Sequence, residues 1–153
     1  MKDILILESK KPFKLVDKQK VFIELALKEI FEEKKVFIQT QYTLSHLSAE
    51  TKLSTNYLSI FFNQILSLHF NDYINRLRIN YFLEMMETGE AHLFTLAGLA
   101  EKCGFHNRNT FTSAFKKVMG QKPSEYVRQQ VSKKLSPNLT GALPSLILPV
   151  PSG

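Results

Sequence analysis

The sequence predicts an all-α protein that contains two copies of one helical unit. Apolar residues recur at helical spacing along most of the chain, and no stretch shows the alternation typical of a half-buried strand. The chain also repeats itself, because residues 43–73 match residues 95–126 at an offset of 52 and then 53. We therefore expect one helical domain over residues 17–134, preceded by a flexible arm (1–16) and followed by a disordered, proline-containing tail (135–153).

The first predicted helix covers about residues 18–34, and Asp17 is its expected N-cap. Polar residues at a spacing of four form a stripe of alternating charge along it, which consists of Lys20, Glu24, Lys28 and Glu32. Apolar residues occupy most of the remaining circumference: Phe22, Ile23, Leu25, Ala26, Leu27, Ile30 and Phe31. We expect this wide apolar face to be buried.

The other helices are placed by their terminal residues. Thr43 and Thr95 each precede a short run with helical apolar spacing, and both are expected N-caps. Asn71 is the expected cap of a long helix over about residues 71–88. Pro123 marks the first turn of a closing helix, where its missing N–H costs nothing.

The internal repeat predicts how these helices are organised. The matching pairs are Thr43 and Thr95, Leu47 and Leu99, Leu58 and Phe111, and Phe62 and Phe115. The offset changes by one residue in the turn before the second helix of each unit. Each unit is therefore a short helix, a tight turn and a longer helix. This helix-turn-helix arrangement occurs over about residues 43–66 and again over about 95–119.

The second helix of each unit has one apolar side and one polar side. In the second unit the polar residues are Arg108, Asn109, Thr112, Ser113, Lys116 and Lys117. In the first unit they are Thr55, Asn56, Ser59, Asn63 and Gln64, together with Ile60. The apolar residues at i and i+4 are expected to face the core, which leaves the polar sides to solvent or to a partner.

The positive charge is concentrated in one segment. The formal net charge is +6, and residues 104–134 hold seven Lys/Arg and one Asp/Glu, which equals the whole surplus. Residues 36–103 have a net charge of −2. A concentrated basic surface indicates a polyanionic partner, although a solvated basic face accounts for the charge equally well.

The residue content excludes several classes of protein. Cys103 is the only cysteine, so an intrachain disulfide or a cysteine-based zinc site cannot form, and its inward register predicts a small core residue. The histidines have no ligand spacing, and no catalytic constellation or glycine-rich phosphate loop stands out. No apolar run is long enough to span a membrane. We therefore expect a cytoplasmic protein that is not an enzyme, has no metal or cofactor, and does not insert into a membrane.

Residues 99–128 resemble the signature stretch of AraC/XylS-type bacterial transcription regulators. The matching elements are Ala100, Gly104-Phe105, Phe111, Phe115-Lys116-Lys117, Gly120, Pro123 and Tyr126. The resemblance extends over about residues 17–131. It implies about seven helices: a leading helix, two helix-turn-helix units in homeodomain-like lobes, a long helix that joins them, and a closing helix. The first unit departs from the family pattern, with Lys52 for a turn glycine and Ser48 for alanine, and Phe82 replaces an alanine of the joining helix.

This resemblance and the polar faces together predict a DNA-binding mechanism. Arginine pairs with guanine and asparagine with adenine through two hydrogen bonds in the major groove, whereas lysine suits phosphate. The expected base-reading residues are Arg108, Asn109 and Ser113 in the second unit and Thr55, Asn56 and Ser59 in the first. The expected phosphate contacts are Thr112, Lys116, Lys117 and Asn63. The family pattern implies that Arg78 is an internal ion-pair residue.

We interpret the chain as a sequence-specific transcription regulator that binds double-stranded DNA, inserting two recognition helices into successive major grooves. The resemblance implies RNA polymerase as a further partner. It also implies a separate sensing or dimerisation domain in many family members, so the chain is either a stand-alone regulator or part of a larger protein. The alternative is a helical protein-interaction module, which the net acidic charge of residues 36–103 favours.

Overall fold

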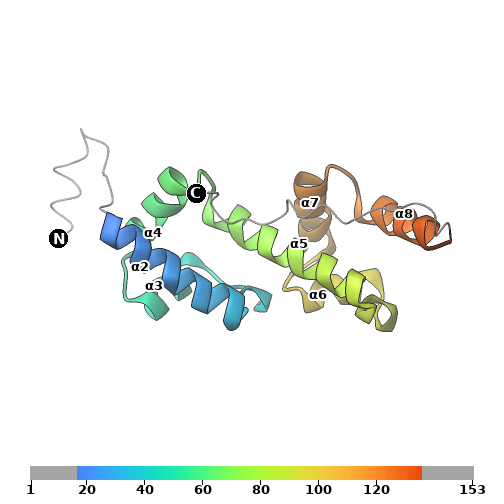
Figure 1. The fold of residues 1–153 in the computed structure, drawn as a ribbon, viewed down its shortest axis with the longest axis horizontal. Coiled ribbons are helices and arrows are strands. Elements are labelled where there is room, and N and C mark those ends of the chain that lie inside the picture. The colour runs from blue at the N-terminus through green and yellow to red at the C-terminus, as the bar shows by residue number, and fades with distance from the viewer. Residues whose placement is uncertain (1–16, 136–153) are drawn as a thin grey trace. The chain divides into compact units, whose positions relative to one another are not determined.

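The structure, a computed structural model, describes residues 17–135, which form helices without a β-strand (Figure 1). The predicted arm (1–16) and residues 136–153 of the predicted tail lie outside the described residues. In this part of the chain there are seven α-helices: α2 (Asp17–Leu27), α3 (Leu44–Thr51), α4 (Thr55–Ile60), α5 (Phe70–Thr88), α6 (Leu96–Lys102), α7 (Arg108–Met119) and α8 (Pro123–Leu135). Short 3-10 or π-helical turns complete it: η2 (Lys28–Glu33), η3 (Val36–Ile38), η4 (Phe61–Ile65) and η5 (Glu90–Leu93). The predicted all-α fold of about seven helices is confirmed.

The chain divides into two compact units. Of the described residues, 17–35 and 43–70 form the first unit, and 36–42 and 71–135 form the second. Helices α3 and α4 are the helix-turn-helix pair of the first unit, and α6 and α7 are that of the second. The chain therefore leaves the first unit at residue 36, returns to it at residue 43, and leaves it again within α5.

The N-terminal helix differs from its prediction in two ways. It includes Asp17 as a helical residue, and from Lys28 it continues as the π-helical turn η2 instead of an α-helix. The expected wide buried face is wrong in part, because Phe22 and Leu25 are 53% and 63% exposed. The buried residues Ile23, Leu27, Ile30 and Phe31 follow one narrow stripe at i, i+4, i+7 and i+8. At about 100° per residue, Leu25 lies on the opposite side of the helix from Ile23 and Leu27, and Phe22 lies about 100° from Ile23.

The first helix-turn-helix unit is defined by its caps and by a small aromatic core. The hydroxyl of Thr43 accepts a hydrogen bond from the backbone N–H of His46, as expected of an N-cap. Ser54 caps α4 in the same way. Leu47 and Leu58 are fully buried. Phe62 is also buried, with its ring centroid 5.2 Å from that of Phe70. The α-helical part of this helix ends at Ile60, because residues 61–65 form the wider π-helical turn η4.

The second unit has a core of aromatic rings that pack edge-to-face or at a tilt. Phe82 on α5 is fully buried, and its ring centroid lies 5.2 Å from that of Phe111 and 5.6 Å from that of Phe115. This side chain fills the space that a smaller residue would leave open. Cys103 is fully buried, which confirms its prediction as a core residue. Helix α5 begins at Phe70, so Asn71 lies inside the helix and is not its N-cap.

Residues 36–42, here called the strap, pack against α5. Arg78 is buried and donates hydrogen bonds from Nε to the carbonyl oxygen of Phe37 at 2.7 Å and from Nη2 to that of Gln39 at 2.8 Å. The internal position of Arg78 was predicted, but its observed hydrogen-bond acceptors are backbone carbonyls and not the carboxylate of an ion pair. Burial lowers the pKa of Arg78 to about 10, so the guanidinium stays charged at neutral pH.

Gly104 lies against both the strap and Arg78, whose Nε would be 2.8 Å from a Cβ at this position. It has a left-handed backbone (φ +102°), and a Cβ built on it would lie 2.6 Å from the carbonyl oxygen of Phe37 and 2.9 Å from Cα of Ile38. Both the conformation and the close approach therefore require glycine here. The matching position in the first unit is Lys52, which has φ 63° without being glycine.

Gly104→Ala should destabilise the protein more than Gly120→Ala. Gly120 also has a positive φ (+76°), but a Cβ there would meet nothing within 4 Å. We expect Gly120→Ala to cost about 1–2 kcal/mol of unfolding free energy from backbone strain. Gly104→Ala adds the steric conflict with the strap, for a total of about 2–5 kcal/mol. Denaturant unfolding measures both, and equal losses would show that the strap leaves room for a side chain.

Lys52→Gly should stabilise the first unit. Removing Cβ relieves about 1–2 kcal/mol of left-handed strain and costs about 0.5–1 kcal/mol through the greater freedom of glycine in the unfolded chain. The expected net gain is about 0–1.5 kcal/mol, with a rise in Tm of up to several degrees. Lys52→Ala is the matched control, since it removes the charge and keeps Cβ. A similar gain from both variants would mean that charge, not strain, limits stability here.

Candidate functional site

Helix α7 turns one side to the core and the opposite side to solvent. Asn107 caps its start by accepting a hydrogen bond from the backbone N–H of Thr110 at 2.8 Å, and Gly120 ends it in a left-handed conformation. Phe111, Ala114 and Phe115 are buried. Successive residues turn by about 100° around a helix, so the centre of the opposite side is formed by Asn109, Ser113 and Lys116. All three are exposed, and we call them the outer row of α7.

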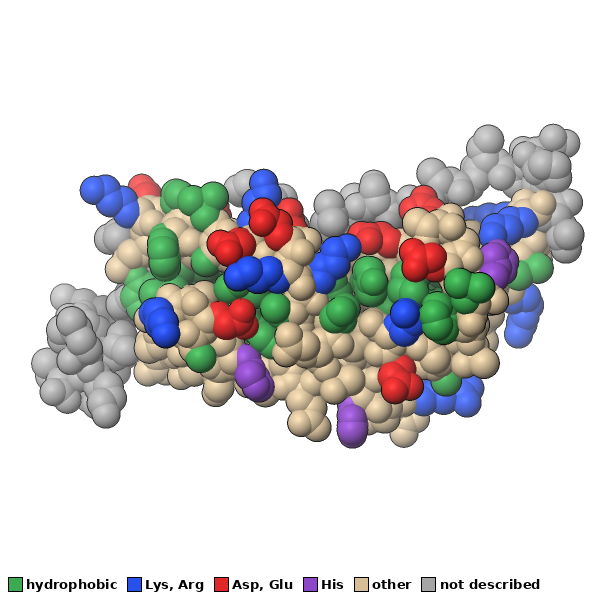
Figure 2. Space-filling view, turned by 90° about the horizontal axis from the view of Figure 1, so that it is seen from below, with side chains coloured by type: hydrophobic (Ala, Val, Ile, Leu, Met, Phe, Trp, Pro, Cys, Tyr) green, Lys and Arg blue, Asp and Glu red, His purple; other side chains and the backbone are tan. Residues whose placement is uncertain are grey.

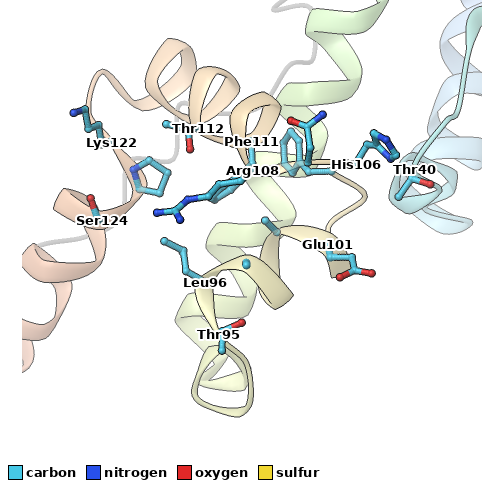
Figure 3. A pocket seen from close by; sticks show the side chains of 15 residues that line it. Thr40, Thr95, Leu96, Glu101, His106, Arg108, Phe111, Thr112, Lys122 and Ser124 are labelled. Atoms are coloured by element: carbon cyan, nitrogen blue, oxygen red, sulfur yellow. The ribbon is translucent and has the colours of Figure 1, made fainter.

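Arg108 and Thr112 lie beside the outer row and line a groove. This groove has a volume of about 970 Å³ and is bordered by the starts of α6, α7 and α8. Figure 3 shows the guanidinium of Arg108 reaching across it toward Leu96 and Ser124. Arg108 therefore points toward the start of α8 and away from the centre of the exposed side.

The groove also has the electrostatic character of an anion site. Arg108 and Lys122 supply positive charge, while Glu101 is the acidic residue of the lining. The starts of α7 and α8 border it, and backbone N–H groups at helix starts favour anions. Sequence reasoning missed Lys122 and Ser124 as part of this site. The available signal was Pro123, which predicted that a helix starts there.

The two lysines that end the polar side of α7 have different surroundings. The Nζ of Lys117 donates a hydrogen bond to Oδ1 of Asp72 on α5 at 2.9 Å, and its side chain is 68% exposed. An ion pair this exposed contributes about 0–1 kcal/mol. Lys116 belongs to the outer row, whereas Lys117 is turned toward α5. The structure therefore separates two residues that the sequence predicted as equivalent phosphate contacts.

The corresponding side of α4 carries no charge. Thr55 and Asn56 are exposed, while Ser59 and Ile60 are half-buried. The offset of 53 places Asn56, Ile60 and Asn63 where the second unit has Asn109, Ser113 and Lys116. Asn63 lies in η4 and donates from Nδ2 to the hydroxyl of Ser59 at 3.3 Å. The predicted polar residues of the first unit thus share one face, with an apolar residue at its centre.

Residues 17–135 lack two other kinds of site, a metal centre and a membrane span. This range holds no group of three or more His, Cys, Asp or Glu side chains placed to bind a metal ion. None of the helices described here is long and apolar enough to cross a membrane.

Comparison with known proteins identifies the family. A family model described as a helix-turn-helix domain matches residues 47–129, more than half of the chain. The chain belongs to the AraC-type helix-turn-helix family. This membership confirms the resemblance found in the sequence, and it places the chain among helix-turn-helix transcription regulators.

Two curated relatives illustrate the sequence similarity. The transcriptional regulatory protein HptR of Staphylococcus aureus (strain NCTC 8325) is 30% identical over 101 residues, which are 66% of this chain and 38% of HptR. The uncharacterized HTH-type transcriptional regulator YijO of Escherichia coli K12 is 29% identical over 108 residues, which are 68% of this chain and 37% of YijO. The AraC-type chain therefore spans less than two fifths of the length of these relatives.

Two solved structures share the fold. The C-terminal domain of AraT, a response regulator from Geobacillus stearothermophilus, superposes with a TM-score of 0.59 at 28% identity, covering 71% of this chain and 84% of that domain. A protein of unknown function from Listeria innocua superposes with a TM-score of 0.58 at 29% identity, covering 70% of this chain and 95% of that one. The helical architecture is thus common to several members of this group.

Proposed function

We propose that the chain is a sequence-specific DNA-binding transcription regulator that inserts α4 and α7 into successive major grooves of a duplex. The observation that carries this proposal is the exposed outer row of α7 beside a groove that has two cationic side chains, Arg108 and Lys122, and is bordered by the starts of α6, α7 and α8. Helix starts and cations bind phosphate, and amide and hydroxyl groups reach base edges. Both kinds of contact are available on one side of the second unit. Such a regulator acts in the cytoplasm and catalyses no reaction.

The position of each side chain suggests its role on DNA. We assign base reading to Asn109 and Ser113 at the centre of the outer row, and to Arg108 once its side chain turns out of the groove. Lys116, Thr112 and the groove residue Lys122 are assigned to phosphate. In the first unit, base reading falls to Thr55, Asn56 and Ser59, with Asn63 near phosphate.

The two units contribute differently to affinity. Neutralising phosphates releases counterions, and this release supplies much of the affinity of DNA-binding proteins. Residues 104–134 hold seven Lys/Arg, whereas the polar face of α4 has none. We therefore assign most of the affinity to the second unit. The first unit adds selectivity through neutral hydrogen-bonding groups.

A protein partner is a second candidate, supported by a different surface. Val21, Phe22 and Leu25 on α2 are 53% to 63% exposed, and clustered apolar side chains favour protein contacts. RNA polymerase or a sensing or dimerisation domain would suit such a surface. Salt separates the two roles, because DNA binding weakens steeply with salt and apolar association does not.

Asn109→Ala should relax base preference at one position of the bound site. Sites are first selected from random duplexes with the unaltered protein, and binding is then compared on preferred and altered duplexes. The expected loss is about 1–3 kcal/mol on the preferred site, with little change where that base pair is already altered. The control is Gln129→Ala, which removes an exposed amide from α8. It should change neither the affinity for the preferred duplex nor the base preference. Uniform weakening on every duplex would make Asn109 a backbone contact.

Asp72→Asn should strengthen DNA binding by releasing Lys117. The carboxylate of Asp72 now holds the ammonium of Lys117 at 2.9 Å, and its removal frees one cation next to the outer row. We expect tighter binding at low salt and a log–log salt slope steeper by about one. The double variant Asp72→Asn with Lys117→Ala should lose the steeper slope. If Asp72→Asn alone leaves affinity and slope unchanged, Lys117 faces away from the duplex.

A further inference from the structure

An apolar groove lies on the second unit between α8 and the segment formed by η5 and the start of α6. Its volume is about 320 Å³. The apolar lining consists of Met86, Ala91, Phe94, Leu96, Leu99, Val127 and Val131, and Gln130 is a polar residue among them. Lys134 and His92 complete its border. None of the predicted DNA-contacting residues lines this groove.

The apolar side chains around this groove are incompletely covered. Val131 is 53% exposed, Phe94 is 37% exposed, and the neighbouring Leu93 is 78% exposed. The ammonium of Lys102 lies 4.6 Å from the ring centroid of Phe94 and covers one ring face. Figure 2 shows hydrophobic side chains at the surface beside a histidine and basic side chains, on the side of the view where α8 lies in Figure 1. A cluster of exposed apolar side chains is typical of a surface that binds another segment or molecule.

The chain itself provides a segment that suits the groove. Residues 136–153 contain no Asp, Glu, Lys or Arg. Within them, residues 143–150 concentrate the large apolar side chains, which are Leu143, Leu146, Ile147, Leu148 and Val150. A segment without charge enters an apolar groove without the desolvation cost of an ion. We propose that residues 143–150 dock in this groove and cover Val131 and Phe94.

The connection between α8 and this segment is long enough for it to fold back. The groove wall on α8 runs from Val127 to Lys134, about 11 Å at a rise of 1.5 Å per residue. The eight steps from Leu135 to residue 143 reach up to about 26 Å when extended. The segment can therefore lie along the whole wall. Pro144 and Pro149 favour an extended conformation, which leaves the apolar side chains free to enter the groove.

Tethering favours this segment over a second copy of the chain. A short covalent link holds an attached segment at an effective millimolar concentration near its site. A second copy at micromolar concentration offers the same apolar residues at a far lower concentration. The proposal does not depend on DNA binding, because groove and segment belong to the same chain.

Paramagnetic relaxation in the full chain tests the proposal. A nitroxide is attached at Ser152→Cys, just beyond the proposed docking segment. Native Cys103 remains unlabelled, because it is fully buried and burial raises the pKa of its thiol to about 12. In a dilute sample, we expect the methyl signals of Val131, Val127 and Leu96 to be broadened strongly.

Substitutions in the tail show whether broadening reflects docking. Ile147→Asp with Leu148→Asp should restore those methyl signals and increase the binding of a hydrophobic dye several-fold. Asn138→Asp is the matched control, since it adds charge to the tail outside the apolar cluster and should leave the broadening intact. Amide spectra of α5 to α7 report that the variants remain folded.

Three results would overturn the proposal. One is the absence of broadening in the dilute sample. Another is equal broadening with and without Ile147→Asp and Leu148→Asp, which would mean random proximity of the tail. The last uses a concentrated mixture in which one set of molecules has the spin label and another set has the isotope label. Broadening that occurs only in this mixture would mean that a second copy of the chain occupies the groove.

Discussion

The second unit depends on a buried guanidinium that holds backbone carbonyls. Arg78 binds the strap through the carbonyl oxygens of Phe37 and Gln39, and the Gln39 oxygen also accepts a hydrogen bond from the backbone N–H of Tyr42 at 3.3 Å. Removing the guanidinium takes a donor from the buried carbonyl of Phe37, and leaving a buried acceptor unsatisfied costs more than the hydrogen bond itself contributes. Gly104 completes the arrangement, because any side chain there would occupy the space of the Phe37 carbonyl. The strap comes between two stretches of the first unit in the sequence, but these contacts make it part of the second unit.

The two helix-turn-helix units share a framework and differ in what they expose. Corresponding threonines cap α3 and α6, and corresponding apolar residues are buried in both. The first unit tolerates a strained lysine at the turn where the second has Gly104, and its second helix widens into η4. These differences, with the uncharged face of α4, suit a unit that refines selectivity beside a basic unit that supplies affinity.

Membership of the AraC-type family and the geometry of α7 are independent observations, and both are consistent with a DNA-binding role for α7. Family membership places the chain among helix-turn-helix regulators. The geometry adds that Asn109, Ser113 and Lys116 form the exposed centre, that Arg108 borders a groove, and that Lys117 is engaged by Asp72. The proposed division into base-reading and phosphate-binding residues follows from these positions.

Local sequence was sufficient for the helices, for the caps of α3 and α6, and for most of the core, but not for the starts of α2 and α5. Thr43 and Thr95 were identifiable because capping involves residues only three positions apart, and Phe111 and Phe115 because helical periodicity places them on one side. Periodicity shows which side of a helix is apolar, but it does not show what covers that side. The exposure of Phe22 and Leu25 was therefore decided by tertiary packing.

Tertiary structure alone also decided the pairings between distant residues. Arg78 meets the strap across 41 positions and Lys117 meets Asp72 across 45, and no local pattern encodes either contact. The groove beside Arg108 arises for the same reason, since three helix starts that are separate in sequence border it. Residue types and spacing specified which helices form and which of their sides are polar. The packing of those helices decided which polar side chains face a partner and which are held inside the protein, because burial and charge pairing depend on neighbours brought together only by the fold.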